Sequence, residues 1–526
     1  MEAIRRRSDR VGAGSAATVT LLIVFFLILL IRTAWISDDA YITFRTVDNF
    51  LNGYGLRWNV AERVQSYTHP LWMMLIAIAH AATGEPYYAT LAISAILTAG
   101  SLIGLVAITD TPVAAMLGLT LVLLSKAFLD YSTSGLENPL THAVLVLFWY
   151  FRWKNDRPGA LGLASSLLAM TRMDTLLLVA PAVADALARH RSIRWLGRFA
   201  VGLLPFAAWE LFSLAYYGVP FPNTAYAKLA STGLGHRELG YQALLYFRDS
   251  LSRDPLTLCT ISAALIVTAR KRDWASAVGI LLYLLYIVRI GGDFMSGRLL
   301  TAPFFVAVLA VAHHGVPRSI TFRSAFATAV VAIALLIPWN NLSGSSYGAG
   351  NQLRYINAAG ISDERAFYYQ WTGLLRVLAG SSVDDTPWAL EGRGFAARGS
   401  GVVASRSVGL VAYYAGPAVH VVDIYALGDP LLARLPSVNN WRIGHFERRI
   451  PEGYLETLSA GRIAIENPGL AGFYEKLVTV TRAPLWTRAR LEAIVGLNLG
   501  RYNGLLAGWK DKARTADPHQ LPGSIN

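Results

Sequence analysis

The sequence has few charged residues and almost no cysteine. Only 15% of its 526 residues are charged, whereas 54% are hydrophobic, and the mean hydropathy is +0.40. This composition excludes an ordinary soluble enzyme and is typical of a protein embedded in a bilayer. The single cysteine, Cys259, excludes a disulfide framework within the chain. Its apolar neighbours predict that it fills a core position.

Sequence motifs of several common enzyme classes are also missing. The chain contains no G-x-G-x-x-G, no P-loop, no H-E-x-x-H and no G-x-S-x-G. No cluster of cysteines and histidines marks a zinc site. The sequence therefore carries no motif for a nucleotide or for a resident metal, and we assign no metal ligands from it.

The charge that is present is mainly basic and unevenly distributed. The formal net charge of +13 arises from 47 Lys and Arg residues against 34 Asp and Glu residues. Much of it lies in short runs beside apolar segments, as in the cytoplasmic loops of membrane proteins. These runs are Arg5 to Arg7, Arg152 to Lys154, Arg189 to Arg191 and Arg270 to Arg272. The pattern predicts membrane lipid, and no nucleic acid, as the surroundings of the protein.

Apolar runs long enough to cross roughly 30 Å of hydrocarbon recur along the first two thirds of the chain. They lie at 15–36, 87–109, 112–128, 139–153, 199–217, 255–269, 274–290, 299–316 and 324–340. Together with two irregular segments, they predict a polytopic α-helical membrane protein with about eleven transmembrane helices. The first run lacks an A-x-A cleavage site and is predicted to be an uncleaved span.

The positive-inside rule predicts a side for each loop. Basic loops are placed in the cytoplasm: 152–158, 189–198, 270–274 and 313–323. The remaining loops are placed outside: 37–69, 130–138, 218–253, 289–298 and all of 341–526. This topology predicts a multi-pass membrane protein whose polar residues face the extracytoplasmic side.

Two segments do not fit simple spans. Parity requires an even number of crossings between 70 and 128, so the short segment 70–83 is predicted not to cross fully. The apolar stretch 159–187 is interrupted by the tetrad Thr171-Arg172-Met173-Asp174. Two short helices meeting at this tetrad would leave Arg172 and Asp174 facing an external cavity, because irregular backbone at membrane depth needs protein or a cavity to satisfy it.

The chain is predicted to contain two domains. Residues 1–340 form a transmembrane domain with the external loop 37–69, and residues 341–526 form an extracytoplasmic domain. The segments 401–403 and 421–425 are rich in β-branched and aromatic residues, as strands are. We therefore expect a mixed α/β or β-rich C-terminal domain.

Adjacent carboxylates follow the first predicted span. Asp38 and Asp39 lie just beyond its end, where a carboxylate could take a proton from an acceptor hydroxyl or stabilise an oxocarbenium-like transition state. The alternative is a solvated turn or an N-cap for the helix 39–51. The pair could also bind a divalent cation, which leaves metal dependence open.

The same loop ends in a polar and aromatic cluster that contains Gln65, Tyr67 and His69. Tyr67 and His69 could donate hydrogen bonds to a sugar or a phosphate. The alternative is that these aromatic side chains anchor the loop at the membrane interface.

Charged residues occur within or beside several apolar segments. They are costly there unless they are paired or face a polar cavity, which makes them candidates for function. They are Glu137, Arg172, Asp174, Asp293 and Arg298. Arg172, Arg298 and Lys228 are external cations that could hold a lipid phosphate as charge builds on it. The alternative is that Arg172–Asp174 and Asp293–Arg298 are structural ion pairs.

The predicted topology limits the donor. Nucleotide sugars are cytoplasmic, whereas the candidate acids and bases face outward. A sugar transferase of this topology therefore needs a donor carried by a lipid.

Several segments of the sequence resemble the GT-C membrane glycosyltransferases, and in detail the mycobacterial terminal arabinofuranosyltransferases, which use decaprenyl-phosphoryl-arabinose. The first matching segments lie between the first two spans: Asp38 to Tyr41, Val47 to Asn49, Gly53 to Asn59, Glu62 to Gln65 and Tyr67 to Trp72. Others follow along the chain: Thr133 to Leu140, Thr171 to Asp174, Pro222 to Lys228, Gly291 to Arg298, Asp423 to Pro430, and Gly444-His445. Each match is short, but their order over most of the chain makes coincidence implausible.

The resemblance implies a GT-C fold, an active site containing Asp38 or Asp39, and transfer of arabinofuranose from decaprenyl phosphate to a cell-envelope polysaccharide. It assigns Tyr41 to the substrate site together with the residues named above. It also implies a C-terminal carbohydrate-binding domain, in which Asp423, Asp429 and His445 would contact the acceptor.

Two other functions fit the same residues. One is a GT-C transferase of another sugar, such as a mannosyl or aminoarabinosyl unit. The other is a flippase or transporter of lipid-linked sugars, which would also bury charges in a helix bundle. A transporter predicts pseudo-symmetric halves, whereas a transferase predicts that Asp38, Asp39, Arg172 and Arg298 form one site.

Overall fold

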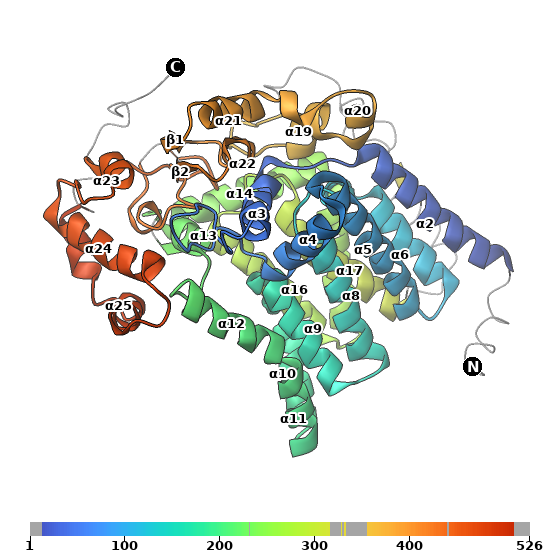
Figure 1. Cartoon of the computed structure of the whole chain (residues 1–526). Coiled ribbons are helices and arrows are strands. Elements are labelled where there is room, and N and C mark those ends of the chain that lie inside the picture. The colour runs from blue at the N-terminus through green and yellow to red at the C-terminus, as the bar shows by residue number, and fades with distance from the viewer. Residues whose placement is uncertain are drawn as a thin grey trace. The chain divides into compact units, whose positions relative to one another are not determined.

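The protein is described by a computed structural model that is mostly helical (Figure 1). The description covers residues 13–230, 232–315, 355–438 and 441–509, and the single positions 328, 331 and 332. The predicted span 324–340 and the predicted domain boundary at residue 340 lie outside this description.

The described chain divides into two compact units that are each built from separate segments. Unit 1 comprises Met1–Ser37, Tyr87–Phe206 and His236–Ser381. Unit 2 comprises Asp38–Pro86, Ala207–Gly235 and Ser382–Asn526. Unit 2 therefore combines the loop 37–69, from Asp38 onward, with most of the C-terminal part, and each unit is described separately below.

Unit 1 consists of helices. Its elements are α2 (Ala13–Thr33), α5 (Pro86–Ile108), α6 (Pro112–Leu124), α7 (Lys126–Asp130), α8 (Asn138–Lys154), α9 (Pro158–Thr171), α10 (Leu176–Arg189), α11 (Ile193–Gly202), α14 (His236–Arg253), α15 (Pro255–Arg270), α16 (Trp274–Ile290), α17 (Thr301–His314), α19 (Glu364–Thr372) and α20 (Leu374–Leu378). These bounds lie close to the runs predicted from hydropathy.

Helix α17 lies in the core of unit 1. Every residue from Thr301 to Ala312 is buried, and the helix packs against α6, α8, α15 and α16. A helix that is apolar on all sides has no face for water, so it is enclosed by its neighbours. The turn Arg298–Leu300 leads directly into it and so carries Arg298 to the end of this enclosed helix.

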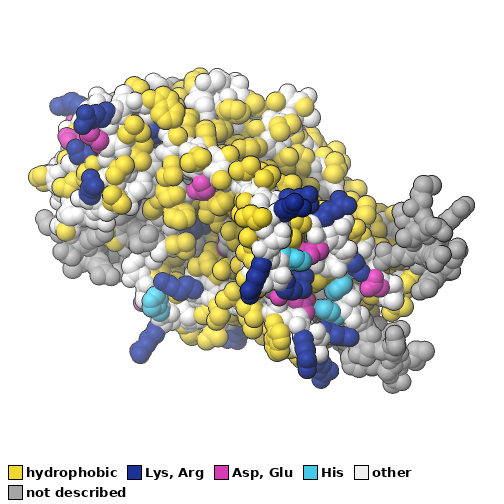
Figure 2. Space-filling view, turned by 90° about the horizontal axis from the view of Figure 1, so that it is seen from below, with side chains coloured by type: hydrophobic (Ala, Val, Ile, Leu, Met, Phe, Trp, Pro, Cys, Tyr) yellow, Lys and Arg dark blue, Asp and Glu magenta, His cyan; other side chains and the backbone are white. Residues whose placement is uncertain are grey.

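Among the described residues, two single helices are long and apolar enough to cross a membrane. They are Gly14–Thr33 and Pro86–Ile108. A third candidate is the pair α11 and α12 (Leu204–Tyr216), which is bent by 49°. Six further apolar helices are shorter, and they include α4 (Pro70–Thr83). Hydrophobic side chains cover much of the face shown in Figure 2, as expected of helices that contact lipid. The count of eleven spans stays a prediction.

One of the two irregular segments has the predicted local structure. Helix α4 has 14 residues and is about 21 Å long at 1.5 Å per residue, but α6 has only 13 residues, so the incomplete span at 70–83 stays a prediction. Helix α9 ends at Thr171, a single 3₁₀ turn covers Met173–Thr175, and α10 begins at Leu176. The break arises at Arg172, whose extended backbone (φ −158°, ψ 116°) ends α9. The predicted interruption at the polar tetrad is confirmed.

Unit 2 contains the strands of the described chain. Its elements are α3 (Asp38–Leu51), α4, α12 from Ala207 onward, α13 (Asn223–Ala225), a π-helical turn (Tyr226–Ala230), α21 (Pro387–Ala397), β1 (Gly401–Ser405), α22 (Leu410–Ala415), β2 (Val419–Asp423), α23 (Tyr454–Ala460), α24 (Pro468–Arg482) and α25 (Arg488–Asn498). Strands β1 and β2 pair in parallel, with Gly401 opposite Val419 and Ser405 opposite Asp423. Both strands were predicted.

The core of unit 2 joins its separate segments. Trp58 and Ile42 from the N-terminal part pack with Val421 of β2 and Phe473 of α24 in one buried cluster. Burial of this much apolar surface is the main force that can hold segments so distant in sequence together. The predicted loop 37–69 is therefore an integral part of this unit.

One sequence prediction about the core was wrong. Cys259 lies on α15 but is exposed, so it fills no core position. An apolar run in a membrane helix has lipid-facing as well as protein-facing positions, and the run alone does not distinguish them.

Candidate active site

Asp38 begins α3, and its carboxylate is bonded to a distant segment of unit 2. Its Oδ1 accepts a hydrogen bond from the backbone N–H of Leu410 at 2.8 Å, and its Oδ2 accepts one from Gly409 at 3.3 Å. These two amides lie at the start of α22. The carboxylate therefore does not merely cap its own helix, which was the alternative interpretation of its position in the sequence.

Gly409 permits this contact because it has no side chain. A Cβ at position 409 would lie 2.0 Å from the backbone oxygen of Asp38 and 2.6 Å from its Cγ. Neither distance is compatible with non-bonded atoms. A glycine at 409 is thus required for Asp38 to occupy this position.

The surroundings of Asp38 suit a proton acceptor. Burial raises the pKa of its carboxyl to about 7, the amide of Leu410 opposes this rise, and the charge of Asp39 adds to it. The residue still keeps part of its surface exposed. A carboxylate with a pKa near the working pH and access to solvent can act as a general base.

Tyr41 lies one turn further along α3 in an aromatic cluster. Its ring centroid is 5.3 Å from that of Tyr413 and 6.4 Å from that of Tyr414, both on α22. The hydroxyl of Tyr414 donates a hydrogen bond to Asp384. Tyr41 itself is buried, so its ring also fastens α3 to α22.

Gln65, Tyr67 and His69 are buried at the end of the same loop. Tyr67 shares a hydrogen bond of 2.8 Å between its hydroxyl and that of Tyr217. His69 Nε2 lies 2.9 Å from Thr43 Oγ1 on α3, and Gln65 Nε2 donates to the backbone oxygen of Tyr67 at 3.2 Å. These contacts order the loop against α3, and direct contact with a substrate stays a prediction.

Arg45 holds the loop to the strand region. Its Nη2 donates to the backbone oxygen of Val419 at 2.8 Å, its Nε donates to that of Trp58 at 2.7 Å, and its Nη1 donates to that of Ala412. The guanidinium also lies 5.2 Å from the ring centroid of Trp58. Arg45 could not be singled out from sequence, because an arginine within an amphipathic helix usually lies on a solvated face.

In unit 1, the structure brings together five of the charged residues predicted from sequence. Glu137 has no exposed surface, and its Oε1 accepts hydrogen bonds from Arg172 Nη1 at 2.9 Å and from Arg298 Nη2 at 3.0 Å. Arg172 also donates to both carboxylate oxygens of Asp174, at 3.0 and 2.5 Å. Asp293 Oδ2 lies 3.9 Å from Arg298 Nη1. We call these five residues the arginine cluster.

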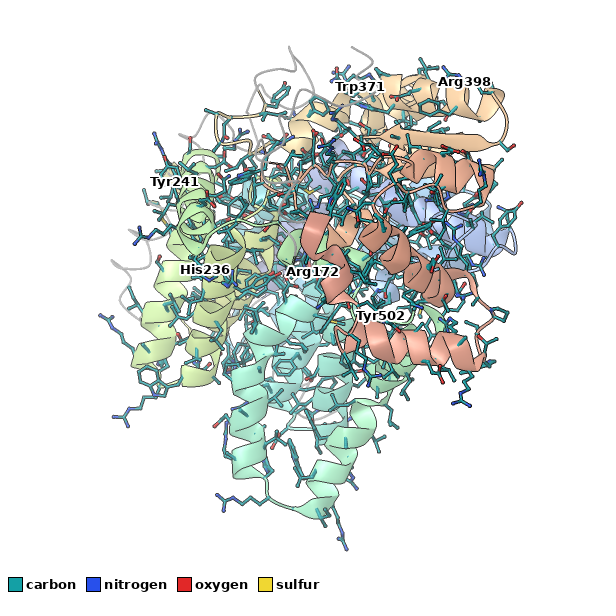
Figure 3. The ribbon with its side chains drawn as sticks, turned by 90° about the vertical axis from the view of Figure 1, so that its left-hand side faces the viewer. Arg172, His236, Tyr241, Trp371, Arg398 and Tyr502 are labelled. Atoms are coloured by element: carbon teal, nitrogen blue, oxygen red, sulfur yellow. The ribbon has the colours of Figure 1, made fainter. Side chains whose placement is uncertain are left out.

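The arginine cluster lies at helix ends. Arg172, which is labelled in Figure 3, is at the break between α9 and α10, and Arg298 begins the turn that leads into α17. The side chains of Arg172 and Arg298 keep 15% and 12% of their surface exposed. Tyr283 on α16 adds a hydrogen bond from its hydroxyl to Asp174 at 3.1 Å. Both guanidiniums are therefore held rigidly by acids while part of each stays accessible.

The arginine cluster can bind an anion when the anion takes the place of a carboxylate. Three carboxylates and two guanidiniums form the arginine cluster, so the arginines are already neutralised. A phosphate could replace one carboxylate contact on each arginine, because a guanidinium offers five donors in a fork that matches phosphate oxygens. The same residues would then form the structural ion pairs and the candidate phosphate site.

A second buried ionic network in unit 1 was missed in the sequence. Lys126 Nζ lies 2.9 Å from Asp363 Oδ2 and is also paired with Asp130. Asp130 Oδ1 lies 2.8 Å from Arg365 Nε, and Asp363 Oδ2 lies 3.4 Å from Arg253 Nη1. The only available signal was that Lys126 and Asp130 interrupt an apolar region, and nothing local linked them to residues more than 200 positions away.

The residues predicted to bind the acceptor lie in unit 2. Asp423 has no exposed surface and accepts hydrogen bonds from the backbone N–H groups of Tyr425, Leu427 and Gly428. Asp429 accepts from Leu431 and Leu432 and from the hydroxyl of Tyr454 at 2.9 Å. Burial raises the pKa of Asp423 to about 6 and that of Asp429 to about 7. These contacts favour a role in shaping the loop that they enclose.

His445 and Lys228 lie close together in the same unit. Burial, together with the charges of Arg442 and Lys228, lowers the pKa of His445 to about 3. The imidazole is therefore neutral at physiological pH. Its ring is perpendicular to that of Tyr425 at 4.9 Å, and both residues are partly exposed. Such a pair offers a sugar an aromatic surface.

The described residues contain no group of three His, Cys, Asp or Glu side chains placed to hold a metal ion. The polar chemistry that they offer consists of a carboxylate near neutrality in unit 2 and the arginine cluster in unit 1.

Known proteins resemble the chain in sequence and in fold. No protein-family model matches it. It is 28% identical to the terminal beta-(1->2)-arabinofuranosyltransferase of Mycobacterium tuberculosis, over 88% of each chain. It is 27% identical to the enzyme of the same name from Corynebacterium glutamicum, over 78% of this chain and 72% of that one.

A solved structure of similar fold is that of ArnT from Cupriavidus metallidurans bound to undecaprenyl phosphate. The match has a TM-score of 0.52 at 13% identity and covers 81% of this chain and 90% of ArnT. This likeness concerns the fold. The resemblance predicted from the short motifs is confirmed by these comparisons. The chain is similar over most of its length to the terminal β-(1→2)-arabinofuranosyltransferases, and its fold is similar to that of ArnT.

Proposed function

We propose that this protein transfers an arabinofuranosyl unit from a polyprenyl phosphate, such as decaprenyl phosphate, to a hydroxyl of a cell-envelope glycan on the extracytoplasmic side of the membrane. The observation that carries the proposal is the 28% identity to an arabinofuranosyltransferase over 88% of each chain.

We assign Asp38 the role of general base. Its carboxylate takes the proton from the acceptor hydroxyl, and the hydroxyl oxygen forms a bond to the anomeric carbon. The bond between that carbon and the phosphate oxygen breaks, and polyprenyl phosphate leaves with the electron pair. The pKa of Asp38, raised to about 7 by burial, supports this role because the carboxylate binds the proton readily and releases it to water. Asp39 supports it by its negative charge.

We assign the leaving phosphate to the arginine cluster. As the glycosidic bond breaks, negative charge grows on the phosphate, and Arg172 and Arg298 would bind it more strongly than in the ground state. Partial exposure of both guanidiniums supports this role. Lys228 is a further candidate cation of the substrate site.

The acceptor is assigned to the surface of unit 2 that carries His445 and Tyr425. Partial exposure of both rings supports the assignment. Asp423 and Asp429 would act indirectly, by holding the loop between them through buried hydrogen bonds.

A transfer assay with radiolabelled decaprenyl-phosphoryl-arabinose tests the proposal. Membranes containing the full-length protein, a glycan acceptor and the lipid donor are compared with membranes containing Asp38→Asn, Asp39→Asn or the double variant. The matched control is Asp48→Asn, because Asp48 lies on the same helix and its carboxylate accepts a hydrogen bond from the neighbouring Asn52. We expect transfer to fall at least about 100-fold in Asp38→Asn, as for loss of a general base, and to persist in the control.

Two outcomes would contradict the proposal. If Asp38→Asn, Asp39→Asn and the double variant all kept full transfer, the catalytic assignment would be wrong. If unlabelled mannosyl or aminoarabinosyl lipid reduced the signal while the arabinosyl lipid did not, the sugar would be wrong. A parallel reaction with a chelator decides whether a divalent cation is needed.

A further inference from the structure

Two consecutive helices of unit 2, α24 and α25, form a hairpin near the C-terminal end of the described chain (Figure 3, beside Tyr502). The inner face of α25 is buried. Ala493 and Ile494 pack against Val480 of α24, and Gly496 is buried as well. This packing fixes the rotation of α25 about its axis and so decides which residues point outward.

Helix α25 is also bonded to the end of α12. Arg490 has no exposed surface, and its Nη1 and Nη2 donate to the backbone oxygens of Ala215 and Tyr216, each at 2.8 Å. Asn498 Nδ2 donates to the backbone oxygen of Gly218 at 2.8 Å. Carbonyls at the end of a helix lack partners within that helix, and an arginine there satisfies them and the helix dipole. The contact is therefore specific to the C-terminal end of α12.

Helix α12 ends at Tyr216, where a span formed by α11 and α12 would leave the bilayer. Helix α12 is the second half of the bent apolar pair that is long enough to cross a membrane. Its residues Leu211 and Leu214 are exposed, as in a lipid-facing helix. Arg490 and Asn498 hold α25 at this end, so α25 lies beside the point where such a span would end.

The outer face of α25 carries an apolar stripe beside the exposed pair Arg488–Glu492. Leu491, Val495 and Leu499 recur every four residues, which places them on one stripe of the helix, and all three are exposed. Trp486, just before the helix, is 75% exposed, and Leu499 is 66% exposed. In water such a stripe is unfavourable, since each Å² of apolar surface left exposed costs about 25 cal/mol.

Arginine side chains lie at both ends of this stripe. Arg488 lies at its start, 93% exposed and paired with Glu492, and Arg501 is exposed just beyond its end. Tryptophan, an aliphatic stripe and flanking arginines are the composition of helices that lie in the interface of a bilayer. The cations fit the phosphate groups of anionic lipids.

We infer that α25 and Trp486 form a membrane-surface anchor, in which Trp486, Leu491, Val495 and Leu499 are immersed at the boundary between lipid headgroups and acyl chains. The occupant of this apolar face is a phospholipid bilayer that contains anionic lipid. The anchor keeps the unit that carries Asp38 at the membrane surface. This inference does not depend on which sugar the protein transfers.

Site-directed labelling of the full-length protein in lipid vesicles tests the inference. A polarity-sensitive fluorophore is attached to Val495→Cys or Leu499→Cys in a Cys259→Ser background, since Cys259 is the only native cysteine and is exposed. The control is Glu475→Cys, an exposed position on α24 of the same hairpin. The vesicles contain phosphatidylcholine and phosphatidylglycerol, some with a nitroxide on the acyl chain close to the headgroup.

We expect the nitroxide lipid to quench the labels at 495 and 499 several-fold more than the label at 475. A water-soluble quencher should show the reverse order. Equal access of the water-soluble quencher to all three positions would overturn the inference. Protection of 495 and 499 from this quencher without quenching by lipid would also overturn it, because a protein would then cover the stripe.

Discussion

Glu137 Oε1 lies 2.9 Å from Arg172 Nη1, and this glutamate has no exposed surface. The same oxygen accepts a hydrogen bond from Arg298 at 3.0 Å. One buried carboxylate thus links the segment before α8, the break between α9 and α10, and the turn before α17. Its charge keeps two guanidiniums close together that would otherwise repel each other.

Replacing Glu137 with glutamine should destabilise the protein. Two largely buried arginines would lose their shared counter-charge, and loss of one partner from a buried ion pair costs about 3–5 kcal/mol. Asp110→Asn is the control, since Asp110 pairs with Lys154 at 2.6 Å on the surface, where such pairs contribute less than about 1 kcal/mol. Thermal unfolding of the purified protein in lipid nanodiscs measures both. Equal melting temperatures for Glu137→Gln and the wild type would show that the arginine cluster does not stabilise the fold.

Replacing Arg172 with lysine should weaken binding of a polyprenyl phosphate. Lysine keeps the charge but cannot hold Asp174 and a phosphate oxygen through a planar fork. We expect the dissociation constant for undecaprenyl phosphate to rise about tenfold, equivalent to about 1.4 kcal/mol. Native mass spectrometry of the variant measures it. Arg189→Lys is the control, since Arg189 pairs with Asp185 on an exposed face. Unchanged affinity for undecaprenyl phosphate in both variants would show that Arg172 is not part of the phosphate site.

Replacing Gly409 with alanine should reduce transfer while leaving the protein folded. The added Cβ would lie 2.0 Å from the backbone oxygen of Asp38, so α22 or the start of α3 must move. Displacement of a catalytic group by about 1 Å can cost about 100-fold in rate. Gly394→Ala is the control, since a Cβ at position 394 meets no atom within 4 Å. Steady-state transfer rates of the two variants test this prediction. Equal rates for both would show that the position of Asp38 does not affect the reaction.

The transfer rate should depend on pH through Asp38. The pKa of its carboxyl is raised by burial to about 7. A general base acts in its ionised form, so activity should be low below this value, rise through it and level off above it. Part of the rise in pKa comes from the charge of Asp39, so Asp39→Asn should move the acid limb of the profile to lower pH. A profile that keeps its midpoint in Asp39→Asn would assign the titration to another group.

The elements that could be predicted from sequence are those encoded by local patterns. The break at Thr171 to Asp174 was predictable because polar residues interrupt one apolar run, and the structure places a single turn there. The strands at 401–405 and 419–423 were predictable from their β-branched residues, and their parallel pairing was not. The charged members of the arginine cluster were candidates because charge at membrane depth is costly.

Contacts between distant segments could not be predicted in this way. The bond from Gly409 to Asp38 joins residues 371 positions apart, and no local pattern marks position 409 as its partner. Arg45 resembled a solvated helix residue, yet it is buried and holds three backbone oxygens of other segments. Such contacts arise only when the core of unit 2 brings the segments together.

The most direct test of the account follows both products of one reaction. The purified protein is reconstituted in vesicles with decaprenyl-phosphoryl-arabinose and a synthetic glycan acceptor, and mass spectrometry measures the extended glycan and the free decaprenyl phosphate. The account predicts that both appear in equal amounts with the wild-type protein and that neither appears above background with Asp38→Asn. Extension of the glycan without release of decaprenyl phosphate, or equal yields with Asp38→Asn, would contradict it.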